Sequence, residues 1–129
     1  MFQPNLQRLL QMKSLISEKS DFSNREVVDN FLLSYFSLLS DPHFPALEIG
    51  VYEGASACYL CEALAFQNRH ATLLDNFHFL KNEQEKFIFI SDVIKKNLSN
   101  VGIDPEKQII LDADSLTHEW KNQKFSFFI

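Results

Sequence analysis

Two of the three glycines in this 129-residue chain lie four positions apart, close behind an acidic residue. They are Gly50 and Gly54 in the stretch ALEIGVYEGAS, where Glu48 interrupts an apolar run. Glycine adopts positive φ values easily and lets a ligand approach the backbone closely. A helical pattern follows Gly54, and the first N–H groups of a helix have no partner within it. Together these features predict a ligand-binding loop between a strand and a helix.

The spacing of the glycines argues against the common phosphate-binding loops. The dinucleotide pattern G-x-G-x-x-G requires three glycines, and Tyr52 occupies the place of the middle one. The pattern G-x-x-x-x-G-K-[ST] of nucleoside triphosphatases has no counterpart in the chain. A nucleotide-binding oxidoreductase domain is therefore a disfavoured interpretation.

Further acidic residues follow two later apolar runs. Asp75 closes the stretch ATLLD, and the pair Asp114-Ser115 comes shortly after QIIL. In open α/β sheets, ligands bind in the crevice beyond the carboxyl ends of the strands, where the order of winding reverses. If these runs are parallel strands, Glu48, Asp75 and Asp114 belong to the same edge of the sheet.

The elements that must position these residues alternate between strand and helix after residue 45. Short apolar runs predict strands at 46–51, 71–75, 108–111 and 125–129. Apolar residues at three- and four-residue steps predict helices at 55–67 and 83–99, with a short helix or turn at 115–122. The alternation predicts an α/β fold, a Rossmann-like parallel sheet with helices on both faces.

The residues before the first strand are expected to form a helical segment of their own. Amphipathic patterns at 5–19 and 24–40 predict two helices, and Asp41-Pro42 ends the second. We therefore divide the chain into an N-terminal helical segment, 1–44, and the N-terminal part of an α/β domain, 45–129. Because FSFFI closes the chain as an apolar strand, we expect the fold to be truncated after its fourth strand.

The stretch EIGVYEGAS resembles motif I of the class I S-adenosylmethionine-dependent methyltransferases. Its pattern, acidic-x-G-x-x-x-G-x-S, looks like that of the branch related to macrocin O-methyltransferase. The later stretches LLDNF, DADS and FSFFI follow in the order that this branch has, so the resemblance covers roughly residues 45–129. It implies S-adenosylmethionine as cofactor and transfer of a methyl group to an oxygen of a small molecule.

The resemblance also implies roles for individual residues. Glu48 would lie below the amino acid end of the cofactor and order the loop, and Asp75 would accept hydrogen bonds from the ribose hydroxyls. Asp114 would accept from the adenine amino group, with Ser115 as a second contact. The remaining implied cofactor contacts come from the glycine loop and from the residue after Asp75: Gly50, Tyr52, Gly54, Ser56 and Asn76.

Each of these assignments has a structural alternative. Glu48 can pair with a lysine or a backbone N–H group, and Asp75 can be a solvated loop residue or a helix cap. Asp114 and Ser115 both belong to the residue types that favour helix N-caps. The joint occurrence of three acids at strand ends is what favours a cofactor site.

The resemblance assigns no catalytic residue to this chain. In the resembling branch the acid-base residue and any metal-binding aspartates come from the fourth strand onward, which places them beyond Ile129. Some relatives bind the acceptor oxygens with a divalent metal such as magnesium, and no ligands for such an ion are assigned here. The alternative function is an inactive or nonenzymatic methyltransferase-fold binding module.

Composition favours a cytosolic protein. A formal net charge of −5 argues against a general nucleic-acid or anionic-membrane binder. No apolar stretch approaches the roughly 18 residues that span a bilayer, and the first residues lack the apolar core of a signal peptide. We expect no nucleic acid and no membrane as partners. The resemblance implies a small-molecule methyl acceptor, and for residues 1–44 it implies either a place in the acceptor pocket or a homodimer contact.

Cys58 and Cys61 form a C-x-x-C pair that raises the question of zinc or redox chemistry. A structural zinc site needs four ligands, and the chain has no second cysteine pair. A thioredoxin-type pair lies at the N-terminus of a helix, whereas this one falls inside a helical pattern. We interpret both as small, partly buried helix residues.

Overall fold

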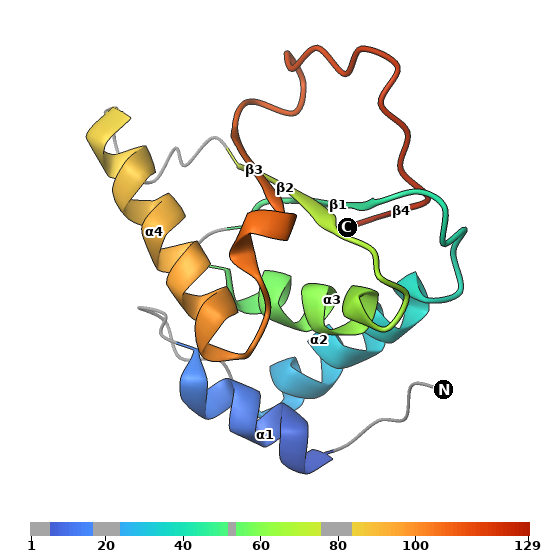
Figure 1. Cartoon of the computed structure of the whole chain (residues 1–129), viewed down its shortest axis with the longest axis vertical. Helices are drawn as coiled ribbons and strands as arrows, with labels where there is room; N and C mark the ends of the chain where they lie inside the picture. The colour runs from blue at the N-terminus through green and yellow to red at the C-terminus, as the bar shows by residue number, and fades with distance from the viewer. Residues whose placement is uncertain (1–5, 17–23, 52–53, 76–83) are drawn as a thin grey trace.

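Four parallel strands form one sheet in the order β3-β2-β1-β4 (Figure 1). The computed structural model describes residues 6–16, 24–51, 54–75 and 84–129. The strands are β1 (Ala46–Ile49), β2 (Ala71–Asp75), β3 (Ile109–Asp112) and β4 (Phe127–Phe128). The helices are α1 (Leu6–Leu15), α2 (Asn24–Ser37), α3 (Ala55–Ala65) and α4 (Gln84–Asn100), and a 3-10 turn, η2, spans Pro105–Lys107.

The strand order places a reversal of winding beside β1. From β1 the chain moves outward through β2 to β3, and β4 then returns to pair with the other edge of β1. The pairing continues past β4, because the N–H of Ile49 donates to the carbonyl of Ile129 (2.8 Å). The carboxyl ends of β1 and β4 therefore meet at the place where α/β sheets bind ligands.

Helices cover one face of the sheet. Residues of α1, α3 and α4 share one buried cluster with alternate residues of β1 and β2: Leu9, Met12, Leu60, Leu64, Ile94, Leu98, Ala46, Ala71 and Leu73. Helix α3 is buried along most of its length, because α2 packs against its outer side. This layer holds α3 rigidly under the loop that precedes it.

The opposite face of the sheet carries no helix in the described part of the chain. The segment from 113 to 126 crosses that side between β3 and β4, as the red trace above the sheet shows (Figure 1). Ile49 is 43% exposed and Phe128 is 67% exposed there, although strand residues of this kind are normally covered in parallel sheets. The parallel α/β architecture is confirmed, and the predicted helices are found on one face only.

Predicted element boundaries differ from the structure where glycine or local turns intervene. The second strand has the predicted bounds, 71–75. The first strand ends at Ile49 instead of at 51, because Gly50 has φ +85° and leaves the extended region. The predicted short helix or turn at 115–122 is a series of turns, and the strand predicted at 125–129 is reduced to 127–128.

Besides the packing of Leu9 and Met12, an arginine of α1 connects this helix to α3 and to the end of α4. The Nε and Nη2 of Arg8 each donate to a different carboxylate oxygen of Glu62 on α3, both at 3.1 Å. Nη2 also donates to the carbonyl of Val101, just after the end of α4. Glu62 accordingly raises the pKa of Arg8, so the guanidinium stays charged and fixes three helices relative to one another.

Candidate functional site

The glycine loop joins β1 to α3 at the reversal point of the sheet. Gly50 has φ +85° and Gly54 has φ +97°, values that side-chain-bearing residues rarely adopt. Gly54 is the N-cap residue of α3, and among the described residues no side chain caps that helix end. A Cβ at Gly54 would lie 3.3 Å from the Cγ2 of Ile94 on α4, whereas a Cβ at Gly50 would meet nothing within 4 Å. Gly54 is therefore required by packing, and Gly50 faces open space.

Glu48 and Ser56 connect the two ends of this loop. Glu48 is only 3% exposed, and its Oε1 accepts a hydrogen bond from the hydroxyl of Ser56 in the first turn of α3. Ser56 therefore uses its hydroxyl on the strand carboxylate and does not cap its own helix. The acidic-x-G-x-x-x-G-x-S pattern thus corresponds to one compact unit, in which the acid lies beneath the loop and the serine fixes it.

Asp75 ends the neighbouring strand beside this unit. The N–H of Gly50 donates to the carbonyl of Leu74 (2.9 Å), so the glycine loop starts in register with the last residues of β2. The N–H of Ala113 donates to the carbonyl of Asp75 (3.0 Å), which brings the end of β3 to the same edge. The half-buried Asp75 therefore lies at the carboxyl edge that also carries Gly50.

Asp114 and Ser115 begin the turns that follow β3. The Oδ1 of Asp114 accepts from the N–H of Leu116 (2.8 Å), and its carbonyl accepts from Thr117 and His118. Asp114 is exposed and Ser115 is half-buried. The alternative of a helix N-cap is not found, because turns and no helix follow Asp114; its side chain closes a local turn instead, and its predicted contact with adenine stays a prediction. Two other predicted contacts, Tyr52 and Asn76, lie outside the described residues.

The C-x-x-C pair lies in the interior of α3, as interpreted from the sequence. Cys58 and Cys61 are both free thiols and both buried. Burial raises the pKa of Cys61 well above its usual value, and the charges of Cys58 and Glu48 raise it further. A thiol in this state has little of the thiolate form that reacts with disulfides or metals.

We expect these thiols to react with Ellman's reagent roughly a hundredfold or more slowly in the native protein than after unfolding. The rate should increase with pH, because the raised pKa of Cys61 keeps the thiolate fraction small at neutral pH. The control is Ser14→Cys, which adds a thiol at an exposed position of α1 and should react at the rate of a small-molecule thiol. Fast native reaction of both original cysteines would contradict their burial.

An apolar groove on the uncovered sheet face is a feature that the sequence patterns do not predict. It has a volume of about 630 Å³ and is lined by residues of β1 and β4 and by Trp120 and Phe125 of the segment that crosses that face. These aromatic residues lie more than 70 positions from β1 in the sequence. Only the return of β4 to the edge of β1 brings them there, and no local pattern indicates it.

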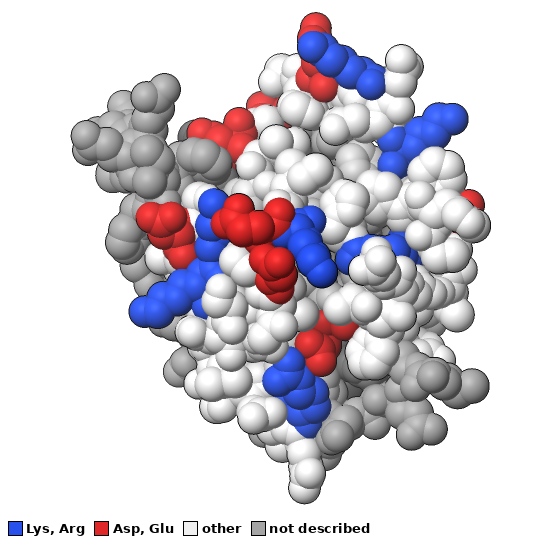
Figure 2. All heavy atoms as spheres, in the orientation of Figure 1, with Lys and Arg blue, Asp and Glu red and all other residues white. Residues whose placement is uncertain are grey.

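The face shown in Figure 2 carries Lys and Arg interspersed with Asp and Glu and no continuous basic patch. Among residues 6–16, 24–51, 54–75 and 84–129, no three His, Cys, Asp or Glu side chains are grouped closely enough to hold a metal ion. Within the same ranges, no helix has the length and apolar character required to cross a membrane.

The structure defines an α/β protein with a four-stranded, all-parallel sheet flanked by helices, an arrangement compatible with a Rossmann-like fold. Comparison with known proteins gives no match to any family model, curated protein or solved structure. The residues at the carboxyl edge of this sheet are therefore the basis for assigning a function.

Proposed function

We propose that this chain is an S-adenosylmethionine-dependent methyltransferase that acts on an oxygen of a small molecule. The observation that supports it most strongly is the Glu48–Ser56 hydrogen bond beneath a loop with two positive-φ glycines. This unit lies at the carboxyl end of β1, where the winding of the sheet reverses, and Asp75 ends the adjacent strand. A buried acid, a glycine loop and a strand-end acid together suit a ligand that is cationic and carries a diol.

The residues at this edge fit the chemistry of S-adenosylmethionine. The cofactor has an amino acid end, a positively charged sulfonium and a ribose diol, and it has no phosphate. The open space at Gly50 lets a ligand approach the loop backbone, and the carboxylate of Glu48 beneath the loop favours positive charge above it. A strand-end carboxylate such as Asp75 can accept from both ribose hydroxyls, one with each oxygen.

When bound, the cofactor supplies a methyl group activated by the sulfonium. The contribution of this chain is to bind and orient it: Ser56 fixes Glu48, Gly50 admits the ligand, and Asp75 sets the position of the ribose. Orientation of this kind accounts for much of the rate of an in-line displacement, because the acceptor must approach opposite the leaving sulfur. A hydroxyl acceptor also needs a general base, and no described residue is assigned to that role.

Calorimetry provides the direct test of the cofactor. The protein is titrated with S-adenosylmethionine, with S-adenosylhomocysteine and with NAD under the same conditions. We expect both sulfur compounds to bind and NAD not to bind, because the loop lacks the glycine pattern of a pyrophosphate cradle. Absence of binding by both sulfur compounds would refute the proposal, and binding without transfer of a labelled methyl group to phenolic or sugar hydroxyls would indicate the nonenzymatic module.

Substitution of Asp75 tests the ribose contact. Asp75→Ala should weaken the binding of S-adenosylmethionine about 10- to 100-fold, the range for losing hydrogen bonds to a charged group. Asp112→Ala is the matched control, because Asp112 is the register partner of Asp75 at the end of β3 and is exposed. It should leave the affinity within about twofold. Equal effects of the two substitutions would show that Asp75 makes no specific contact.

A further inference from the structure

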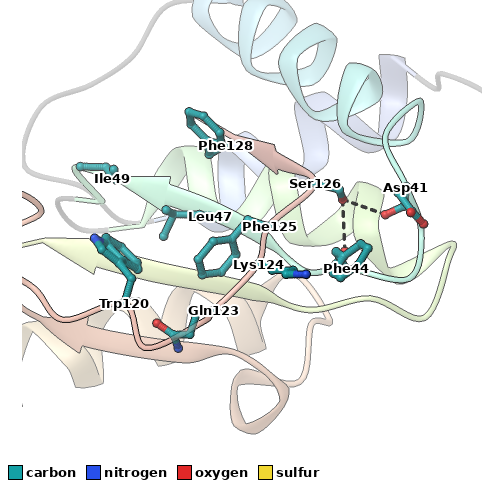
Figure 3. Close-up of a pocket in the computed structure, with 10 residues that line it drawn as sticks. All are labelled: Asp41, Phe44, Leu47, Ile49, Trp120, Gln123, Lys124, Phe125, Ser126 and Phe128. Atoms are coloured by element: carbon teal, nitrogen blue, oxygen red, sulfur yellow. Dashed lines mark hydrogen bonds between the residues drawn. The ribbon is translucent and has the colours of Figure 1, made fainter.

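The groove on the uncovered face of the sheet has an apolar floor and aromatic walls (Figure 3). Leu47 and Ile49 of β1 form its floor beside Phe128 of β4. Trp120 and Phe125, from the segment that crosses this face, stand beside Leu47 in the same view. None of these residues belongs to the glycine loop or to the strand-end acids, so the groove is a separate feature of the chain.

The aromatic wall is held in a fixed arrangement by its own contacts. The rings of Trp120 and Phe125 meet edge to face, with centroids 5.9 Å apart and planes at 87°. His118 contacts Trp120 in the same manner on another side, at 4.5 Å and 80°. Contacts of this geometry stabilise aromatic pairs beyond simple burial and limit their rotation. The groove therefore presents a preformed apolar surface and not a set of mobile side chains.

The rim of the groove carries one acidic residue, Asp41, and one basic residue, Lys124. Asp41 lines one end, and its carboxylate already accepts from the N–H of His43 (2.9 Å) and contacts the His43 ring nitrogen (2.8 Å). These hydrogen bonds lower the pKa of Asp41, which keeps it ionised and occupied. Lys124 also lines the groove and extends toward Phe44. Within the described residues, no ion pair or hydrogen bond engages the Lys124 ammonium group.

We infer that this groove binds a flat, apolar small molecule that carries an anionic group, such as an aromatic carboxylate. The ring system would lie against Leu47, Ile49 and the Trp120–Phe125 wall, and the carboxylate would be within reach of Lys124. The inference does not depend on the proposed function, because it uses no residue of the glycine loop and a different face of the sheet.

Size and shape favour a small molecule over a protein segment. Ligand pockets typically have volumes of about 300–1,000 Å³, and this groove of about 630 Å³ falls within that range. One turn of helix, about 5.4 Å long and 10–12 Å across, fills roughly 400–600 Å³, so the groove accepts about one turn.

The test uses the fact that Trp120 is the only tryptophan in the chain. Its indole N–H gives a single indole cross-peak in a nitrogen-15 correlation spectrum, and that peak lies at the proposed site. Biphenyl-4-carboxylate is titrated as the probe, with biphenyl-4-carboxamide as its neutral counterpart. We expect a saturable shift of the indole peak with both probes and about two- to fivefold tighter binding of the carboxylate, the range for an exposed ion pair.

Two lysine variants identify the source of this preference. Lys124→Ala should remove the preference for the carboxylate while retaining the shift with the amide. Lys121→Ala is the matched control, because Lys121 is exposed in the same segment, pairs with Glu119 at 3.8 Å and does not line the groove. It should leave the preference unchanged. If both variants lower the preference equally, the recognition of the anion by Lys124 is refuted.

A third variant tests the apolar surface itself. Phe128→Asp adds a carboxylate at a residue that is 67% exposed, so the fold should tolerate it, and it should abolish binding of both probes. Failure of either probe to move the Trp120 peak in the original chain would overturn the inference. So would a peak position that depends on protein concentration and not on the probe, because a second copy of the chain would then occupy the groove.

Discussion

Replacement of Arg69 with methionine is expected to lower the free energy of unfolding by about 3 kcal/mol. Arg69 is 9% exposed, and its guanidinium donates five hydrogen bonds of 2.9–3.1 Å. Its acceptors come from four separate parts of the chain: the carbonyls of Ser37 and Phe44 and the side chains of Ser40, Gln67 and Ser126. Methionine fills a similar volume and leaves these acceptors without their donor.

The expected loss of stability depends on whether each acceptor has another donor once the guanidinium of Arg69 is removed. The hydroxyls of Ser40 and Ser126 can turn toward each other, since their oxygens are already 3.3 Å apart. The buried carbonyl of Ser37 keeps the N–H (3.2 Å) and the hydroxyl (2.5 Å) of Ser40 as donors, and the carbonyl of Phe44 keeps the hydroxyl of Ser126 (3.4 Å). The expected loss therefore comes from removing five hydrogen bonds to a charged donor together, and a single such bond contributes roughly 1.5–3 kcal/mol. Loss of the shared guanidinium also removes a connection between the end of α2 and the start of β4.

Urea unfolding followed by circular dichroism measures this effect, and two further variants define its cause. Arg69→Lys keeps the charge and loses the planar set of donors, so its loss of stability should be smaller than that of Arg69→Met but still clear. Arg8→Met removes a partly exposed arginine that pairs with Glu62, and we expect a loss of only about 1 kcal/mol. An effect of Arg69→Met no larger than that of Arg8→Met would contradict the central role of Arg69.

The contacts of Arg69 are an example of long-range interactions that local sequence patterns do not predict. An arginine between a helix and a strand reads as a solvated loop residue, and nothing near it in the sequence indicates acceptors at Ser37 and Ser126. The contact with Ser126 exists because β4 returns to the edge of β1, a step that joins residues 57 positions apart. The aromatic groove is formed by the same return. Features of this kind depend on topology, and topology is not a local property.

Local features were predictable because glycine and strand patterns act locally. The bounds of β2 and the burial of the cysteine pair agree with the sequence analysis. The glycine loop lies at the predicted strand end. Its position could be predicted because the ability to adopt a positive φ depends on the individual residue, here Gly50 and Gly54. The prediction for the first strand extended two residues too far, since an apolar Val51 continues the pattern after the backbone has already turned at Gly50. At Val51, apolar character indicates that the side chain is buried but not that the residue belongs to a strand.

The two glycines of the loop should respond differently to alanine, although both have positive φ. Gly54→Ala is expected to lower the free energy of unfolding by about 3 kcal/mol, because backbone strain of about 1–2 kcal/mol is added to crowding in the core. The crowding arises because the new Cβ would lie 3.3 Å from the Cγ2 of Ile94, a buried side chain of α4 that must shift by a few tenths of an ångström in a packed core. Gly50→Ala meets nothing within 4 Å, so only the strain of about 1–2 kcal/mol applies.

For the affinity for S-adenosylmethionine, we expect the opposite order, with the larger effect from Gly50→Ala. The Cβ at Gly50 enters the open space above the loop, so Gly50→Ala should weaken the binding of S-adenosylmethionine at least about tenfold while the protein stays folded.

A double-mutant cycle isolates the contribution of packing to the stability effect of Gly54→Ala. Ile94→Ala removes the atoms that the new Cβ approaches, so the loss in the double variant should be smaller than the sum of the two single losses by about 1 kcal/mol. If the stability losses of Gly54→Ala and Ile94→Ala simply add in the double variant, the effect of Gly54→Ala comes from backbone strain alone. Equal stability losses for Gly54→Ala and Gly50→Ala would likewise rule out packing against α4 as the cause.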